Sequence, residues 1–221
     1  MHEGKEKIRK RKRIQLIMWW LLPIIIFGGI FWPYIGYLVL CMMLFFFVLS
    51  AFRGRYWCGW FCPRGSFLER ILVYISRNKK IPSFFKDMKF RWPVFYILIS
   101  FMILRLIQSG GAAEKIGFVF VTMCTITTAI AIPLGIIFKP RVWCAFCPMG
   151  TLQGIIGRNK YLLSISADCV ECGTCEKNCP IGTNPVAFKV TEKVKSIDCL
   201  RCPDCMVNCS KNALRFNQDD K

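Results

Sequence analysis

The sequence has one histidine, His2, and that residue lies in a strongly charged N-terminal segment. A single histidine cannot supply the two axial ligands of a bis-histidine haem, and it leaves no histidine-rich zinc or copper site. The chain also lacks a P-loop, a Rossmann glycine fingerprint and a Ser-His-Asp constellation. No catalytic residue is therefore predicted, and the sequence gives no support to nucleotide-dependent or hydrolytic chemistry.

Acidic residues are scarce as well, because 13 Asp and Glu stand against 31 Lys and Arg. Hydrophobic residues make up 54% of the chain, which is too apolar for an ordinary soluble domain. Four apolar runs are each long enough to cross a bilayer, which takes about 20 residues. These runs are residues 14–31, 34–52, 92–108 and 116–138.

Basic residues flank the four runs unequally. Seven precede the first run, ten lie between the second and third, twelve follow the fourth, and the two opposite connections hold only Lys115. Cytoplasmic loops carry the excess of Lys and Arg, so we expect a multi-pass protein of the cell inner membrane with both termini in the cytoplasm. The tail from Asn159 is nearly neutral, which places the surplus charge at the membrane and argues against nucleic-acid binding.

Two cysteine motifs with identical spacing occupy this tail. The first reads C-x2-C-x2-C-x3-C-P from Cys169, and the second repeats the spacing from Cys199 with Ser210 in place of the proline. In two-cluster ferredoxins the fourth cysteine of each motif binds the other cluster. The first predicted [4Fe–4S] cluster therefore uses Cys169, Cys172, Cys175 and Cys209. The second uses Cys199, Cys202, Cys205 and Cys179.

Zinc ribbons and disulfides are the alternatives for these eight cysteines. Zinc sites use paired C-x2-C knuckles without a required third cysteine two residues further on. Disulfides need an oxidising compartment, whereas the charge distribution places this tail in the cytoplasm. The spacing favours two [4Fe–4S] clusters.

A second pair of cysteine motifs follows the second and fourth apolar runs. The segment R-Y-W-C-G-W-F-C-P-R-G begins at Arg55, and R-V-W-C-A-F-C-P-M-G begins at Arg141. These internal repeats predict two hairpin-plus-motif units in the same orientation. They would bring Cys58, Cys62, Cys144 and Cys147 together at the cytoplasmic membrane surface. Such thiols suit a third metal centre, a dithiol pair or a transient metal site, or they simply pack helix ends.

Two further cysteines, Cys41 and Cys124, lie inside the second and fourth runs at similar places in the two repeats. One explanation is that each cysteine is a small apolar side chain that packs between membrane helices. The alternative is a metal centre midway through the bilayer, which would need additional thiolates from a partner.

These features resemble the NapH/NosR/CcoG group of membrane-bound ferredoxins, and NapH is closest in layout. The resemblance rests on four spans, two C-x2–3-C-P motifs and the paired ferredoxin motifs, so it covers nearly the whole chain. It implies quinol-linked electron transfer, or copper reduction as in CcoG. The second Cys-Pro motif is one residue shorter than the C-x3-C-P form usual in the group.

The predicted architecture is an α-helical membrane protein with four transmembrane helices arranged as two repeated hairpins, followed by a small α+β two-cluster ferredoxin-like domain. Its expected parts are a basic segment (1–13), a membrane domain (14–160) and the ferredoxin domain (161–221).

Three functions are consistent with this sequence. The first is an electron-transfer subunit, similar to a quinol dehydrogenase, that exchanges electrons between the quinone pool, its cytoplasmic clusters and a redox partner carrying flavin, haem or iron–sulfur groups. The second is a conduit from cytoplasmic ferredoxin to an extracytoplasmic flavin or haem partner. The third is a copper-reducing or metal-handling assembly factor, for which Met42, Met43, Met102 and Met123 would be soft ligands.

Overall fold

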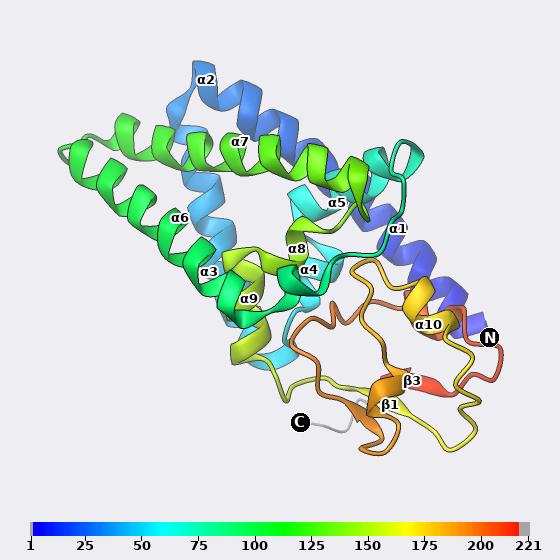
Figure 1. Ribbon diagram of the computed structural model, residues 1–221. Helices are drawn as coiled ribbons and strands as arrows, with labels where there is room; N and C mark the ends of the chain where they lie inside the picture. Colours follow the sequence, from blue (N-terminus) through cyan, green and yellow to red (C-terminus); the bar gives the residue numbers. More distant parts are fainter. Residues whose placement is uncertain (1, 217–221) are drawn as a thin grey trace.

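The computed structural model describes residues 2–216, and most of that length is helical (Figure 1). Four helical segments are long and apolar enough to cross a membrane. They are Gly4–Phe31, Pro33–Arg53, Met88–Gln108 and Ala113–Ile137. The four expected apolar spans are thus confirmed as helices.

The first segment starts well before its apolar part. Helix α1 (His2–Pro23) passes through a π-helical turn (Ile24–Gly28) into α2 (Gly29–Phe31). The π turn follows Pro23, whose missing N–H and ring disturb the regular hydrogen-bond ladder. The basic N-terminal residues are therefore part of one helix that continues into the first span.

The second segment begins with a 3-10 turn (Pro33–Ile35) and continues as α3 (Gly36–Arg53). Helices α6 (Met88–Gln108) and α7 (Ala113–Ile137) form the hairpin drawn in green (Figure 1). Helix α7 packs closely on the first hairpin, because a Cβ on Gly36 would lie 1.9 Å from the Gly117 carbonyl oxygen. Small residues allow such backbone approach between membrane helices.

Short helices follow α3 and α7. After α3 come α4 (Tyr56–Trp60), α5 (Pro63–Ile71) and 3-10 turns at Leu72–Tyr74 and Ser83–Lys86; after α7 come α8 (Trp143–Phe146) and α9 (Pro148–Ile156). Both α5 and α9 begin at the proline of a Cys-Pro pair. Proline suits the first helical position because its missing N–H would have no intrahelical partner there. Each Cys-Pro pair is thus a helix start.

The cysteine-rich tail combines a small sheet with short helices. Strand β1 (Leu163–Ile165) pairs antiparallel with β2 (Lys193–Val194) and β3 (Leu214–Phe216). Between the strands lie α10 (Thr174–Lys177), a 3-10 turn (Val186–Phe188) and α11 (Asp204–Val207). Leu163, Ile165, Val194 and Leu214 form a core with Cys175 and Cys205, so the two cysteine motifs are folded around the sheet.

Candidate metal centres

Four of the tail cysteines surround one cavity. Its lining includes Cys169, Cys172, Cys175 and Cys209, which come from both motifs. Cys175 is buried and Cys172 is exposed. The structure therefore brings together the set that the spacing assigns to the first cluster, and four thiols are the ligand set of a [4Fe–4S] group.

The other four tail cysteines lie deeper. Burial raises the pKa of Cys205 well above its ordinary value, and the neighbouring Cys199 and Cys179 raise it further. Burial likewise raises the pKa of Cys202, with a contribution from Cys179. This mutual influence places the second predicted set, Cys179, Cys199, Cys202 and Cys205, in one neighbourhood.

Within residues 2–216, no group of three or more His, Cys, Asp or Glu side chains is placed to hold a single metal ion. The thiolates of a [4Fe–4S] core bind different iron atoms around a cube. The sulfurs around such a core are therefore further apart than the ligands of one ion.

The arginine of each Cys-Pro motif forms a hydrogen bond to the other motif. Arg55 of the first motif donates to the carbonyl oxygen of Cys144 at 2.5 Å, and Arg141 of the second donates to that of Cys58 at 2.5 Å. Both guanidinium groups are almost wholly buried, at 1% and 0% exposure. The matched residues of the two repeats thus make the same contact in both directions.

Two glycines make room for these arginines. A Cβ on Gly150 would lie 2.5 Å from Nη2 of Arg55, and a Cβ on Gly65 would lie 3.3 Å from Cζ of Arg141. Each repeat therefore provides a glycine against which the other repeat's arginine packs.

Carboxylates neutralise these cations. Arg55 pairs with Asp198 at 3.4 Å and Arg141 pairs with Glu69 at 2.5 Å. Asp198 also pairs with Arg91 at 2.7 Å. Burial alone would raise the pKa of Glu69, but its arginine neighbours outweigh burial and hold that pKa below its ordinary value.

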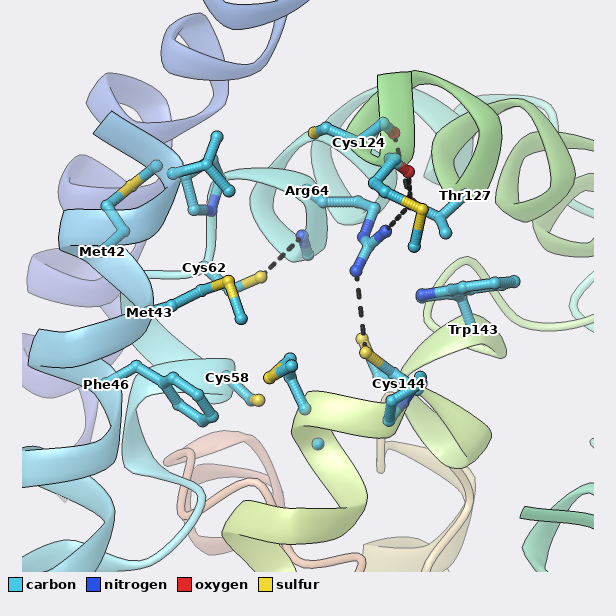
Figure 2. A pocket seen from close by; sticks show the side chains of 18 of the residues that line it. Met42, Met43, Phe46, Cys58, Cys62, Arg64, Cys124, Thr127, Trp143 and Cys144 are labelled. Atoms are coloured by element: carbon cyan, nitrogen blue, oxygen red, sulfur yellow. Dashed lines mark hydrogen bonds between the residues drawn. The ribbon is translucent and has the colours of Figure 1, made fainter. Parts of the chain in front are cut away.

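The four Cys-Pro thiols line a second, larger cavity of about 210 Å³ (Figure 2). They are Cys58, Cys62, Cys144 and Cys147. Cys58 donates to Oε1 of Gln153 at 2.7 Å, and Cys62 accepts from the backbone N–H of Gly65 at 3.4 Å. The structure thus brings together the four thiols that the repeat predicts to face one another.

Burial raises the pKa of Cys58, and it raises the pKa of Cys144 to about 11 although Arg141 opposes the shift. Thiol–disulfide exchange needs a thiolate, and reactive cysteines have lowered pKa values. As free thiols these residues would be protonated and unreactive near neutral pH, whereas iron binding holds cysteine as thiolate.

Most of the cavity wall is apolar and comes from the spans. Arg64 and Thr127 provide polar groups, and Arg64 donates to the Thr127 hydroxyl (Figure 2). Arg64 also donates to the Cys147 sulfur. The wall also contains five methionines: Met42, Met43, Met102, Met123 and Met149.

The two intramembrane cysteines differ in position. Cys124 lies on the cavity wall, whereas Cys41 is exposed on α3 and is not part of that wall. The structure does not bring them to one site, so a shared mid-membrane centre stays a prediction. The hydroxyls of Thr122, Thr125 and Thr127 each donate to a carbonyl in the preceding turn of α7. Threonine commonly satisfies the hydrogen-bonding requirement of its hydroxyl in this way within a helix.

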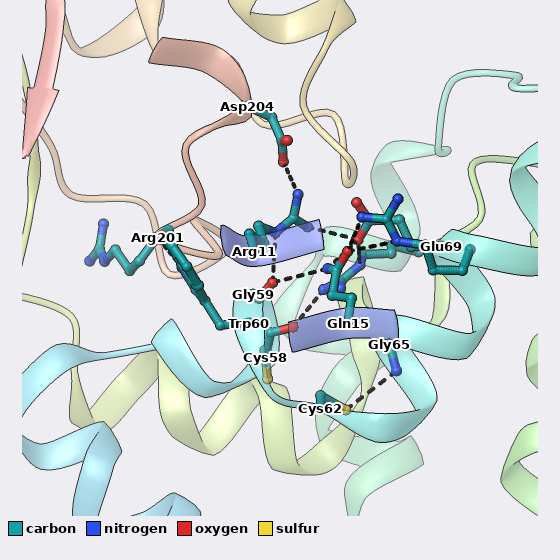
Figure 3. Close-up of polar contacts among 12 residues, drawn as sticks. Arg11, Gln15, Cys58, Gly59, Trp60, Cys62, Gly65, Glu69, Arg201 and Asp204 are labelled. Atoms are coloured by element: carbon teal, nitrogen blue, oxygen red, sulfur yellow. Dashed lines mark hydrogen bonds and ion pairs between the residues drawn. The ribbon is translucent and has the colours of Figure 1, made fainter. Parts of the chain in front are cut away.

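Arg64 and Arg11 are site residues that sequence reasoning missed. Arg11, only 2% exposed, donates to the Gly59 carbonyl oxygen at 2.9 Å and pairs with Glu69 at 2.7 Å and Asp204 at 2.6 Å (Figure 3). In the sequence it is one of the seven basic residues before the first span, which predict the cytoplasmic side. One feature of the sequence distinguishes Arg64: the second Cys-Pro motif has Met149 at the matching position.

The second tail motif is seated directly on the first Cys-Pro motif. A Cβ on Gly59 would lie 2.2 Å from the Leu200 carbonyl oxygen. The indole N–H of Trp60 donates to the Arg201 carbonyl oxygen at 3.1 Å. Cys202 also belongs to the same buried core as Cys58. The second tail set is therefore the one that adjoins the Cys-Pro thiols.

Comparison with known families gives one match, described as a 4Fe-4S binding domain, over residues 35–82 and 121–165. Those two segments contain both Cys-Pro motifs and neither tail motif. No solved structure matches the chain with significance.

Four curated proteins are related over most of this chain. Two uncharacterized proteins of Methanocaldococcus jannaschii are 31% and 30% identical over 77% of the chain, covering 67% and 75% of their own lengths. The putative electron transport protein YccM of Escherichia coli is 24% identical over 80% of the chain and 55% of its own length. The ferredoxin-type protein NapH of Haemophilus influenzae is 29% identical over 80% of the chain and 66% of its own length.

Proposed function

This chain belongs to the NapH-like family of ferredoxin-type, 4Fe-4S proteins, and on that basis we propose that it is a membrane-bound electron-transfer subunit. It would exchange electrons between the quinone pool, its iron–sulfur clusters and a partner redox protein. As an iron–sulfur electron transport protein it needs no bond-making residues, because the protein binds the inorganic groups and tunes them.

The observation that carries this proposal is the continuity of the three cysteine sets. The first tail set contributes Cys175, and the second contributes Cys205, to one small core. The second set also contributes Cys202 to the core that contains Cys58 and Cys144. We assign the two tail sets to two [4Fe–4S] clusters and the Cys-Pro set to a third. The three would form one path from the exposed end of the tail to the membrane spans.

The family match supports the third cluster. The segments that match a 4Fe-4S binding domain contain Cys58, Cys62, Cys144 and Cys147. These four thiols line one cavity, and burial raises the pKa of Cys58 and Cys144, which disfavours those two as thiol-exchange residues. The backbone N–H of Gly65 and the guanidinium of Arg64 donate hydrogen bonds to the sulfurs of Cys62 and Cys147, and such bonds tune iron–sulfur centres.

Quinone exchange would take place on the membrane side of the same cavity. Its wall there is formed by apolar side chains of α1, the π turn, α3, α6 and α7, such as Leu22, Val39, Leu98 and Phe120. Ligand sites for apolar molecules combine such walls with a few placed polar groups. The excess of basic residues supports an inner-membrane location with both termini in the cytoplasm.

The test is the iron and acid-labile sulfide content per chain after anaerobic purification. Three [4Fe–4S] clusters give about twelve irons, and the double variant Cys58→Ser/Cys144→Ser should retain about eight. Cys41→Ser is the matched control, because Cys41 lies outside the cavity wall, and it should keep the wild-type content. A wild-type content of about eight, unchanged in the double variant, would refute the third cluster.

A metal-handling function is the second candidate, because one observation favours it. All four methionines named from the sequence line the cavity beside the Cys-Pro thiols, and Met149 joins them. Thioether and thiolate ligands suit copper(I). This function predicts about eight irons and a labile ion that a chelator removes, and Met42→Leu/Met43→Leu would weaken copper(I) binding without changing the iron content.

A further inference from the structure

The guanidinium groups around the Cys-Pro motifs outnumber the carboxylates. Five arginines bond to the motifs or to the carboxylates paired with them: Arg11, Arg55, Arg64, Arg91 and Arg141. Three carboxylates face them: Glu69, Asp198 and Asp204. Arg64 is partly buried and the other four are almost wholly buried. A cation withdrawn from water without a partner is unfavourable, so this region favours further negative charge.

Arg64 is the arginine without a carboxylate. Arg11, Arg55, Arg91 and Arg141 each form at least one ion pair. In the described part of the chain, no carboxylate lies within ion-pair distance of Arg64. Its guanidinium instead contacts the Cys147 sulfur at 3.6 Å, the Thr127 hydroxyl and, at 5.3 Å, the ring of Trp143.

The chemical surroundings of Arg64 thus consist of sulfur, one hydroxyl and an aromatic face. Cys62, Cys124, Cys144 and Cys147 are the groups whose negative charge would stabilise it. Thiolates that bind iron carry such charge, and a [4Fe–4S] core with four thiolates is negative overall. A neutral set of thiols would leave the cation uncompensated.

We propose that Arg64 is the counter-cation of the Cys-Pro centre and that it raises the reduction potential of that centre. This inference rests on the third cluster of the proposed function. Adding one electron from a tail cluster increases the negative charge beside Cys147, and Arg64 stabilises that charge. Arginine stays protonated throughout, so the electron arrives without a proton at this residue.

Thr127 fixes the position of Arg64. Its hydroxyl accepts from Nη1 of Arg64 while it donates to the carbonyl oxygen of Met123 on α7. The guanidinium therefore lies against Thr127 of the fourth span (Figure 2) and also contacts the sulfur of Cys147. The second repeat has Met149 in place of Arg64, so only one side of the motif pair carries this charge.

The experiment is a potentiometric titration, monitored by electron paramagnetic resonance, of the full-length holoprotein. The variant Arg64→Met introduces the side chain that the second repeat carries, and Arg64→Lys keeps the charge. We expect Arg64→Met to reduce the fraction of reduced Cys-Pro centre about tenfold at fixed ambient potential, which is a shift of about 59 mV for one electron. Lysine should retain most of the wild-type potential.

Three further measurements make the result specific. The shift should be equal at pH 6 and pH 8, because arginine does not titrate in that range. Thr127→Val should lower the potential in the same direction by a smaller amount, since it frees the guanidinium without removing it. Arg105→Met is the matched control, because Arg105 is exposed on α6 and its guanidinium lies over the ring of Phe101.

The signals of the two tail clusters report whether each variant is folded and loaded. An unchanged potential in Arg64→Met, with these signals intact, would overturn the role of Arg64 and leave the third cluster standing. A wild-type iron content of about eight would overturn the third cluster itself, so the two failures are distinguishable.

Discussion

Glu69 should be a sensitive charged residue of the fold, because it neutralises two buried arginines at once. Its carboxylate lies 2.7 Å from Arg11 and 2.5 Å from Arg141, whose side chains are 2% and 1% exposed. Glu69→Gln keeps the shape and one acceptor oxygen but removes the charge. Removing one partner of a buried pair costs about 3–5 kcal/mol, and the 19% exposure of Glu69 favours the lower end.

A loss of about 3 kcal/mol in the free energy of unfolding corresponds to a fall in melting temperature of roughly 6–12 °C for a chain of this size. The assay is thermal unfolding of the detergent-solubilised holoprotein. Glu171→Gln is the matched control, because Glu171 pairs with Lys189 at 2.8 Å on the surface, where ion pairs contribute little. A fall of less than about 2 °C for Glu69→Gln would show that the carboxylate does not compensate the two arginines.

The pH dependence of this effect has a definite sign. The pKa of Glu69 is lowered in the folded protein. The ionised carboxylate therefore contributes its full stabilisation of the folded state at pH values above the ordinary pKa of glutamate. It is lost as the pH falls through the lowered folded-state value. The difference in melting temperature between wild type and Glu69→Gln should therefore be constant near neutral pH and shrink in acid, and a gap that widened in acid would contradict the assignment.

Two further predictions concern the seating of the tail on the first Cys-Pro motif. Gly59→Ala should loosen the tail, because the new methyl group would lie 2.2 Å from the Leu200 carbonyl oxygen; faster proteolysis of the tail is the readout, and wild-type resistance would contradict the close approach. Trp60→Phe removes the 3.1 Å hydrogen bond to the Arg201 carbonyl oxygen and should lower the free energy of unfolding by about 1 kcal/mol. The readout is a small fall in melting temperature, and no fall would mean that water replaces the indole N–H.

The spans were predictable because length and apolarity decide them. The fourth apolar run covers residues 116–138, and the structure is helical over Ala113–Ile137. The rotation of each helix about its own axis was not predictable. Cys41 and Cys124 occupy similar places in the two repeats, yet one is exposed and the other lines the cavity. A stretch that is apolar all round gives no sign of which face is packed.

The charged part of the site was hidden for a different reason. Charge counting treats Arg11 as one of seven equivalent basic residues before the first span. Its burial depends on Glu69 and Asp204, which lie 58 and 193 residues away along the chain. Such pairs form only when distant segments meet, so local patterns cannot reveal them. Arg64 differs, because comparing the two repeats singles it out against Met149.

The exchange of arginines between the two Cys-Pro motifs has a consequence for how such a chain could arise. Arg55 completes the second motif and Arg141 completes the first, so neither half satisfies its own arginine. Half a chain on its own would be incomplete, but two identical halves could satisfy each other, as in a twofold dimer whose interface is self-complementary. The contact joins residues 83 and 89 positions apart, and it has the form of an interface between subunits within one polypeptide. Arg64 and Met149 occupy matching positions in the two repeats, so the centre that this interface encloses carries a charge on one side only.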